Sequence, residues 1–206
     1  MKKTIISCVL FLTAVTAFSQ TPMKTAAEAK LSASDLAVKI ADRILATTTY
    51  EFKNTKTGKT YKSVKNLPLD MNVKVACKYN NWHYTNGVTH IALMELADKT
   101  GAKKYDDYVL KNMNFVFNEG NLDFFKKQYE QAMKNEGWYG VRKLSWHMIF
   151  RGKRLDDNGP MGASLIDLQM KHPNNSFLNY INETAEHLNY GEPRLADGTI
   201  ARIWPH

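Results

Sequence analysis

The sequence predicts an all-α protein with about six helices joined as helical hairpins. Apolar residues recur every three or four positions through most of the chain, which is the spacing of one face of an α-helix. Signals for strands are few and short, and a glycine-containing turn at 101–105 separates two of the predicted helices, as is common in arrays of helical hairpins. With 206 residues, 44% of them hydrophobic, the chain is long enough to bury one core. This composition excludes disordered, collagen-like and disulfide-stapled proteins.

The first residues predict an export signal rather than part of the fold. Lys2 and Lys3 precede an apolar stretch at 5–18 that is too short to span a bilayer comfortably, and small residues suited to cleavage follow. We therefore predict a signal peptide over 1–19, and a protein exported to the periplasm or the extracellular space. A lipid anchor would need a cysteine just after the apolar stretch. Cys8 lies inside that stretch instead, so we expect no membrane anchor.

The rest of the chain is predicted to be a polar leader over 20–32 followed by one domain over 33–206. The chain has 28 lysines and arginines against 20 acidic residues, a formal net charge of +8, which favours acidic partners. The basic residues are mostly scattered lysines rather than a compact block, so we expect no nucleic-acid partner. Metal-ligand spacings, phosphate loops and dinucleotide fingerprints are missing from the sequence, so we expect no metal and no cofactor.

The first helix of this domain is predicted over 33–48. Leu36, Ile40 and Ile44 repeat there every four residues, which places them on one face of a helix. The segment 50–78 that follows has no helical period and contains seven lysines, a glycine and a proline. It is therefore predicted to be a long loop or a short hairpin.

Five further helices are predicted from apolar spacing of the same kind. The segment 137–157 interrupts them and is predicted to be a loop or hairpin, because it is rich in aromatic residues and arginine and has no clear period. The helix after it is placed at a proline because proline suits a first helical turn. The predicted helices begin near Asn86, Lys104, Leu122 and Pro160, and the last carries an apolar stripe from Phe177 to Leu188.

A motif rich in aromatic residues opens the second predicted helix. Trp82 and Tyr84 could stack on the face of a sugar, and Asn86 could cap the helix or bond to a sugar hydroxyl. Gly87 would let another segment or a ligand approach closely. The alternative is that the aromatic residues only anchor the start of the helix in the core. The residues by themselves leave both interpretations open.

Two adjacent acids, Asp156 and Asp157, precede Pro160. They could both stabilise a helix N-terminus, or one could cap the helix while the other serves a pocket. Aromatic and basic residues crowd the segment before them, among them Trp146 and His147, our further candidates for substrate binding. Such residues can hold an acidic sugar through stacking and charge-assisted hydrogen bonds, or they can simply cover the core.

Four segments together resemble the ordered motifs of unsaturated glycuronyl hydrolases. These are glycoside hydrolase families 88 and 105, which include unsaturated rhamnogalacturonyl hydrolases. The resemblance extends over residues 33–206 and implies a partial (α/α)6 barrel. The segments that carry it are Trp82–Gly87, Thr100–Tyr105, Leu155–Ala163 and Arg194–Thr199 with Arg202.

The resemblance also implies a reaction and a site. Such enzymes remove a 4,5-unsaturated uronic acid from oligosaccharides made by polysaccharide lyases, by hydrating its vinyl ether double bond. An oligosaccharide containing an unsaturated uronic acid is therefore the expected partner. Asp157 matches the first of the family's two active-site aspartates. Trp82 and Tyr84 match the aromatic motif that lines the sugar site, with Asn86 beside them.

One part of the family pattern is missing from these 206 residues. The principal acid/base aspartate of such enzymes lies in a later Trp-x-Asp-Asp motif, which the sequence does not contain. We therefore expect the chain to be an amino-terminal part of such an enzyme, truncated before that aspartate. The alternative is an exported helical-repeat protein that binds carbohydrate or acts as a scaffold without catalysis.

Two structural expectations follow from a partial barrel. The loops that carry Tyr84 and Asp157 should lie at the same end of the helices, because both motifs start helices that follow equivalent connections in the family. The apolar faces of the inner helices should be uncovered, for example around Ile91 and Leu165.

Overall fold

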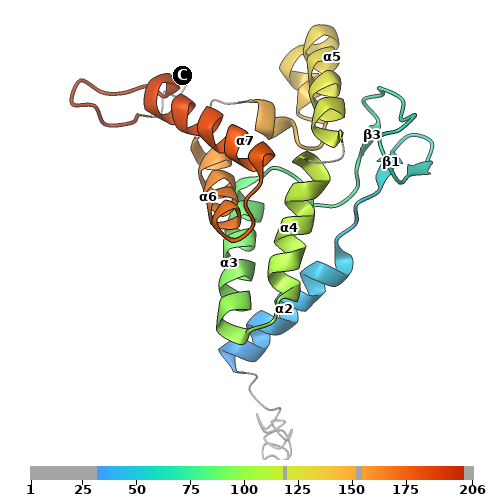
Figure 1. Cartoon of the computed structure of the whole chain (residues 1–206). Helices are drawn as coiled ribbons and strands as arrows, with labels where there is room; N and C mark the ends of the chain where they lie inside the picture. The colour runs from blue at the N-terminus through green and yellow to red at the C-terminus, as the bar shows by residue number, and fades with distance from the viewer. Residues whose placement is uncertain (1–31, 118–119, 152–154, 202–206) are drawn as a thin grey trace, which may run out of the picture. The chain divides into compact units, whose positions relative to one another are not determined.

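The structure is a computed structural model that describes residues 32–117, 120–151 and 155–201 (Figure 1). Within the last range, the side chains of Leu155 and Asp157 are not described. The predicted signal peptide, nearly all of the predicted leader and Arg202 lie outside the described residues. The chain divides into two compact units, Met1–Lys39 and Ile40–His206.

The first unit contributes the start of one helix to the described residues. Ser32 begins it, because its hydroxyl oxygen accepts a hydrogen bond from the backbone N–H of Asp35 at 3.1 Å. The same hydroxyl donates to the Asp35 carboxylate at 2.7 Å. These bonds satisfy one of the free N–H groups of a helix N-terminus.

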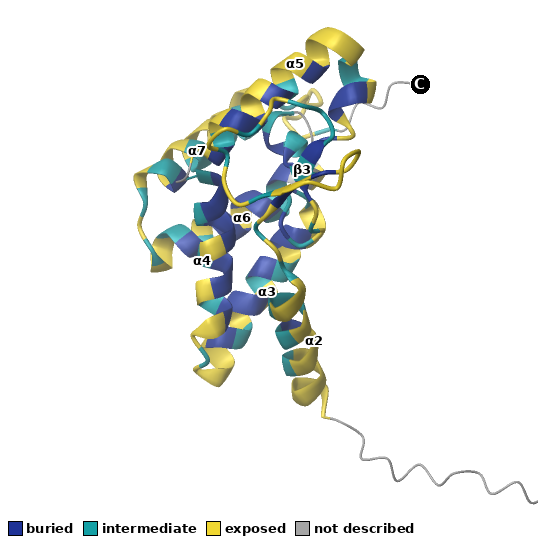
Figure 2. Ribbon diagram, turned by 90° about the vertical axis from the view of Figure 1, so that its right-hand side faces the viewer, coloured by how far each residue is buried: buried dark blue, intermediate teal, exposed yellow. Residues whose placement is uncertain are grey.

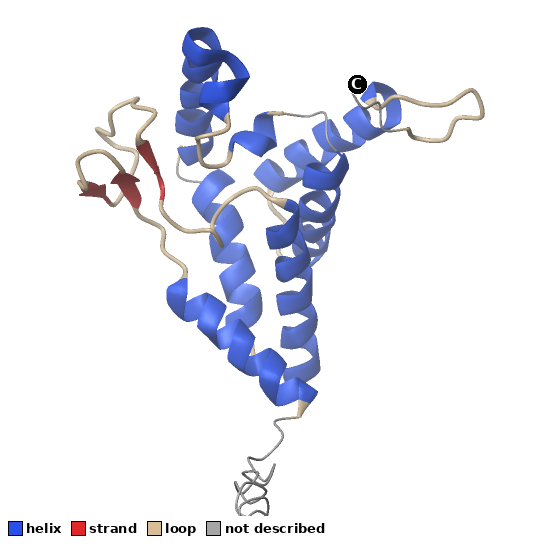
Figure 3. Cartoon of the chain, turned by 180° about the vertical axis from the view of Figure 1, so that it is seen from behind, coloured by secondary structure: helices blue, strands red, loops and turns tan. Residues whose placement is uncertain are grey.

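The prediction of an all-α fold is confirmed. Helices make up most of the described chain, with a small sheet and two short helical turns, the 3-10 helix η1 and the π-helical turn η2 (Figure 3). The helices are α2 (Ala33–Thr47), α3 (Tyr84–Thr100), α4 (Lys104–Phe117), α5 (Asn121–Val141), α6 (Leu155–Lys171) and α7 (Asn175–Glu186), and the short turns are η1 (His147–Phe150) and η2 (His187–Gly191).

Two helix boundaries differ from the predictions. α6 begins five residues before Pro160, so the proline lies inside the helix rather than in its first turn. Asp156 and Asp157 occupy the first turn instead, where the positive end of the helix dipole favours acidic residues. α5 continues beyond its predicted end near residue 135, through a kink at Gly137. Gly137 has φ 59° and ψ −150°, a conformation that glycine adopts without a Cβ penalty.

The lysine-rich segment 50–78 forms a small antiparallel sheet. The strands are β1 (Phe52–Asn54), β2 (Thr60–Tyr61) and β3 (Val73–Val75), in the order β2-β1-β3. The predicted short hairpin is therefore present, and a third strand joins it. The Gln128 side chain on α5 donates to the backbone carbonyls of Asp70 at 2.7 Å and Val73 at 2.8 Å, which fixes the sheet against that helix.

The remaining helices of the second unit form two hairpins, α3 with α4 and α6 with α7. α3 packs most extensively against α6 (Figure 1). These two helices run parallel, because Gly87 meets Pro160 near their N-terminal ends, while Lys171 bonds to Asp98 at 2.7 Å near their C-terminal ends. Lys171 also pairs with Asp106 at the start of α4, as expected when α4 runs antiparallel to α3.

Aromatic rings connect the sheet to the helices through the core. Phe52 lies beside Phe125, and Phe125 stacks on Trp146 with ring centroids 6.1 Å apart. Trp146 in turn contacts Trp82, whose ring meets Tyr180 edge-on at 5.0 Å. Figure 2 shows this buried region as the dark blue interior of the helices. Each such pair adds about 0.5–1.5 kcal/mol beyond area burial.

The predicted exposure of the apolar helix faces is wrong in its detail. Leu165 is fully buried, and Ile91 is half-buried. The adjacent position carries the exposed side chain instead, because a step of one residue turns a helix by about 100°. The exposed apolar side chains of α3 and α6 include Val88, Ile166 and Met170.

The described helices were also compared with the requirements of a bilayer. None of them combines the length and the apolar character that a membrane span needs.

Candidate functional site

The start of α3 is held by hydrogen bonds of its own motif. His83, rather than Asn86, is the N-cap, and its Nδ1 accepts from the backbone N–H of Thr85 at 3.4 Å. Asn86 is buried, and its side-chain nitrogen donates to the carbonyls of Lys78 at 2.9 Å and Asn81 at 2.8 Å. The sequence-based assignment of Asn86 as the cap is therefore wrong, since its carboxamide is needed to close the preceding loop.

Two contacts bring the starts of α3 and α6 together. The indole Nε1 of Trp82 donates to the Asn158 side-chain oxygen at 3.3 Å, and both residues are buried. Gly87 lies against the backbone of Pro160, where an added Cβ would stand only 2.3 Å from the carbonyl carbon. The close approach expected at Gly87 is thus an approach of α6. Tyr84 and the backbone of Asp157 consequently lie at the same end of the two helices, as predicted.

The two tryptophans of the candidate site are part of the core. Trp82 has an exposed fraction of 0% and Trp146 of 1%, so neither ring offers a free face to a sugar in this structure. Trp146 has φ 60°, in the left-handed region that bulky residues rarely adopt. Its backbone N–H donates to the Asn81 side-chain oxygen, which holds that conformation. We therefore correct the expectation that these rings stack on substrate: they anchor the loops that carry the site.

Exposed polar groups surround this anchored junction. Tyr84 is 46% exposed, and its ring lies 4.6 Å from that of His83. Asp156 in the first turn of α6 is exposed as well. Asp157 has its backbone in the same turn, and its side chain lies outside the described atoms. The exposed hydroxyl and carboxylate suit a polyhydroxylated ligand, and two helix N-termini favour a negatively charged one.

His147 lies farther along the adjacent loop, at the start of η1. It is half-buried, with Nδ1 2.8 Å from the carbonyl oxygen of Leu144, to which it donates. Its ring meets that of Trp138 edge-on, with centroids 6.0 Å apart. η1 is tied to α7 by the Tyr180 hydroxyl, which donates to the Ile149 carbonyl at 3.4 Å. No described contact joins His147 to Tyr84 or to Asp156.

Burial sets the protonation of two groups near the junction. It raises the pKa of Tyr180 above its ordinary value, so this phenol stays neutral and can donate. It lowers the pKa of His90, one turn along α3 from Asn86, to about 4. His90 is therefore neutral near pH 7, with Nε2 3.2 Å from the Asn112 side-chain nitrogen. Both groups stabilise the junction rather than take part in acid–base chemistry.

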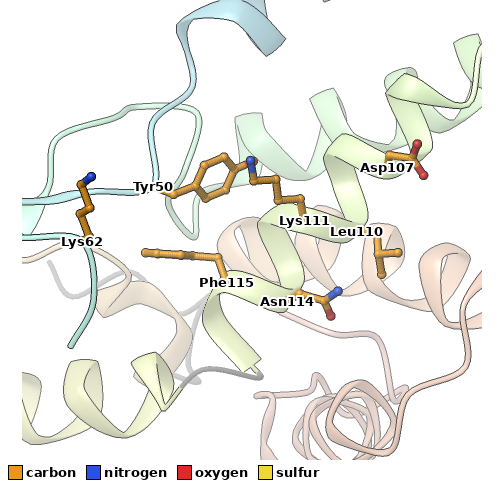
Figure 4. A pocket seen from close by; sticks show the side chains of 7 residues that line it. All are labelled: Tyr50, Lys62, Asp107, Leu110, Lys111, Asn114 and Phe115. Carbon is orange, nitrogen blue, oxygen red and sulfur yellow. The ribbon is translucent and has the colours of Figure 1, made fainter. Parts of the chain in front are cut away.

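A pocket of about 310 Å³ lies elsewhere, between α4 and the lysine-rich segment (Figure 4). Sequence analysis missed it, because its residues belong to a predicted loop and to a helix face with no motif. The run of lysines in 50–78 was the one signal that could have suggested it. The pocket is lined by Tyr50, Lys62, Asp107, Leu110, Lys111, Asn114 and Phe115.

A search for metal ligands was made over the described residues. Within them, histidine, cysteine and carboxylate side chains form no group of three or more that could hold a metal ion.

Comparison with known proteins adds a family to this geometry. Residues 53–204, nearly three quarters of the chain, match the family model of Glycosyl Hydrolase Family 88. The match includes both the junction of α3 with α6 and most of the pocket. A search of curated proteins finds no match.

Proposed function

The chain belongs to Glycosyl Hydrolase Family 88, and we propose that its substrate is an oligosaccharide that ends in a 4,5-unsaturated uronic acid. Family membership supports glycoside hydrolysis in general. The unsaturated substrate is supported by the sequence motifs at the start of α3 and α6. An oligosaccharide substrate also agrees with the export that residues 1–19 predict.

The observation that carries the proposal is the junction of α3 and α6. The Trp82–Asn158 hydrogen bond and the contact of Gly87 with Pro160 hold two helix N-termini together. The exposed Tyr84 and the first turn of α6 that contains Asp157 therefore lie at one end. Positive helix ends would attract the uronate carboxylate, and the tyrosine would contact the sugar ring or its hydroxyls.

The proposed reaction is the addition of water to the double bond of the uronic acid. A proton goes to ring carbon C4 and the water oxygen to C5, which gives a hemiketal. The hemiketal then opens and releases the next sugar. Asp157 would accept a hydrogen bond from the water or from a uronide hydroxyl and so orient it. Protonation of carbon needs a correctly placed acid, which the family's Trp-x-Asp-Asp motif would supply and which these 206 residues do not contain.

The test measures binding and turnover of an unsaturated disaccharide from a lyase digest, with the saturated disaccharide as the control ligand. We expect the chain to bind the unsaturated sugar more tightly. We expect Asp157→Asn to weaken that binding by about tenfold, the scale of one hydrogen bond to a charged group. Asp167→Asn, on the same helix but away from its N-terminus, is the matched control and should change nothing.

Two results would overturn the proposal. The first is equal affinity for the saturated and unsaturated sugars, which would favour a general carbohydrate-binding protein. The second is loss of the double-bond absorbance by the chain at a rate that Asp157→Asn leaves unchanged, which would remove Asp157 from the site.

A further inference from the structure

The pocket beside α4 has a built floor and a charged rim. Leu110, Lys111, Asn114 and Phe115 come from the second half of α4, Tyr50 follows α2, and Lys62 follows β2 (Figure 4). The rings of Tyr50 and Phe115 meet edge-on at 5.6 Å. Phe115 is buried and Tyr50 half-buried, so the floor is rigid and apolar.

The rim of this pocket is positively charged. The Lys111 ammonium lies 4.4 Å from the centre of the Tyr50 ring, which holds it beside the hollow. Among the described residues, neither Lys111 nor Lys62 forms a salt bridge. The segment 50–78 adds six further lysines and only two acids, Glu51 and Asp70. Asp70 is already bonded to Asn54 and Asn72, so the local field remains positive.

The size and chemistry of the pocket select a class of ligand. A volume of about 310 Å³ is at the lower end of the range of about 300–1,000 Å³ for ligand sites, which suits a single sugar residue. An apolar floor fits the C–H face of a sugar ring. The carboxylate of Asp107 and the carboxamide of Asn114 at the edge match ring hydroxyls, and the two ammonium groups match a carboxylate.

We propose that this pocket binds a uronate residue of an acidic polysaccharide, with the uronate carboxylate between the ammonium groups of Lys62 and Lys111. The pocket shares no residue with the junction of α3 and α6. It would hold a polysaccharide chain on the enzyme without acting on it. This second site needs no double bond in the sugar, so it stands or falls separately from the proposed hydrolysis.

The experiment titrates the full chain with a saturated oligogalacturonate, by calorimetry at low salt. The double variant Lys62→Gln with Lys111→Gln should weaken binding by about tenfold, since it removes two charge-assisted contacts that are partly exposed to solvent. Lys134→Gln removes the same type of charge from an exposed position on α5 that does not line the pocket. It should leave the affinity within about twofold of wild type.

Further arms separate the proposal from its competitors. A neutral oligosaccharide of equal length and inorganic phosphate should each bind at least about tenfold more weakly than the oligogalacturonate. Asp157→Asn should leave this affinity unchanged, whatever it does to an unsaturated substrate. Equal effects of Lys134→Gln and the pocket variants, or phosphate binding as tight as uronate binding, would overturn the proposal.

Discussion

The junction of α3 with α6 and the pocket beside α4 use aromatic residues in opposite ways. At the junction, the rings of Trp82 and Trp146 are enclosed, and their loops carry the polar groups. At the pocket, the ring of Tyr50 stays partly open and supports the Lys111 ammonium. An aromatic motif at a helix start therefore does not by itself indicate a stacking surface. Whether a ring is open to ligand depends on which other segments pack over it.

The largest expected effect concerns the contact that makes the junction. Gly87→Ala would place a Cβ 2.3 Å from the backbone of Pro160, and backbone cannot move aside as a flexible side chain can. We expect the free energy of unfolding to fall by about 3 kcal/mol, the upper part of the usual range for overpacking. Urea denaturation of the full chain measures the loss.

Gly159→Ala is the matched control for that substitution. Gly159 also lies in a helix, but no described atom stands within 4 Å of an added Cβ. We expect it to raise the free energy of unfolding by about 0.5–1 kcal/mol, because alanine favours the helix over glycine. Equal losses for the two variants would mean that α3 and α6 do not meet at Gly87.

A second prediction tests how completely the junction excludes water. Burial lowers the pKa of His90 from 6.5 to about 4, so the unfolded chain binds a proton that the folded chain does not bind between these values. Stability from this group is complete above about pH 6.5 and falls as the pH decreases through that window. Between pH 7.5 and 4.5 the loss is about 2.5 kcal/mol.

Denaturation curves at the two pH values measure this acid sensitivity. His90→Gln should remove about that much of the pH dependence while lowering stability at neutral pH. His172→Gln at the end of α6 keeps His90 and serves as the control. An unchanged pH dependence in His90→Gln would show that water reaches the interior of α3.

The smallest prediction concerns the pocket side of the comparison. The Tyr50 hydroxyl is enclosed and has no hydrogen-bond partner among the described residues, whereas the Tyr108 hydroxyl lies 2.9 Å from that of Thr48. Tyr50→Phe removes an unsatisfied polar group and should raise the free energy of unfolding by up to about 1 kcal/mol. Tyr108→Phe breaks a bond and should lower it by about 1 kcal/mol. Thermal denaturation of the two variants compares them, and a loss in both would indicate a bond that Tyr50 makes in solution.

Most helix positions were predictable because their signals are local. α2 and α4 begin at or within a residue of the predicted positions, and Gly101 ends α3 in a left-handed conformation. Pro160 misled the prediction for α6, since a preference for the first turn does not prevent a helix from extending one turn earlier. Asn86 was misassigned as a cap for a related reason: its bonds to the loop before α3 cannot be seen in a pattern of capping residues.

The candidate site was predictable in place but not in detail. The motifs located the starts of α3 and α6, and those starts do lie together. The exposure of their residues could not be predicted, because Trp82 is covered by Tyr180 from α7 and by Trp146 from the loop after α5. The pocket beside α4 was not predictable either, since Lys62 and Lys111 are far apart in the chain.

The sequence by itself determined the all-α class, most helix boundaries, the family and the end of the helices where its motifs gather. These depend on apolar spacing and short motifs, which act over a few residues along one chain segment. Only the tertiary structure decided that Trp82 and Trp146 are anchors, that Gly87 is where α3 and α6 meet, and that two lysines share a hollow. Burial and charge proximity depend on which segments pack together, and that packing joins residues which no local pattern relates.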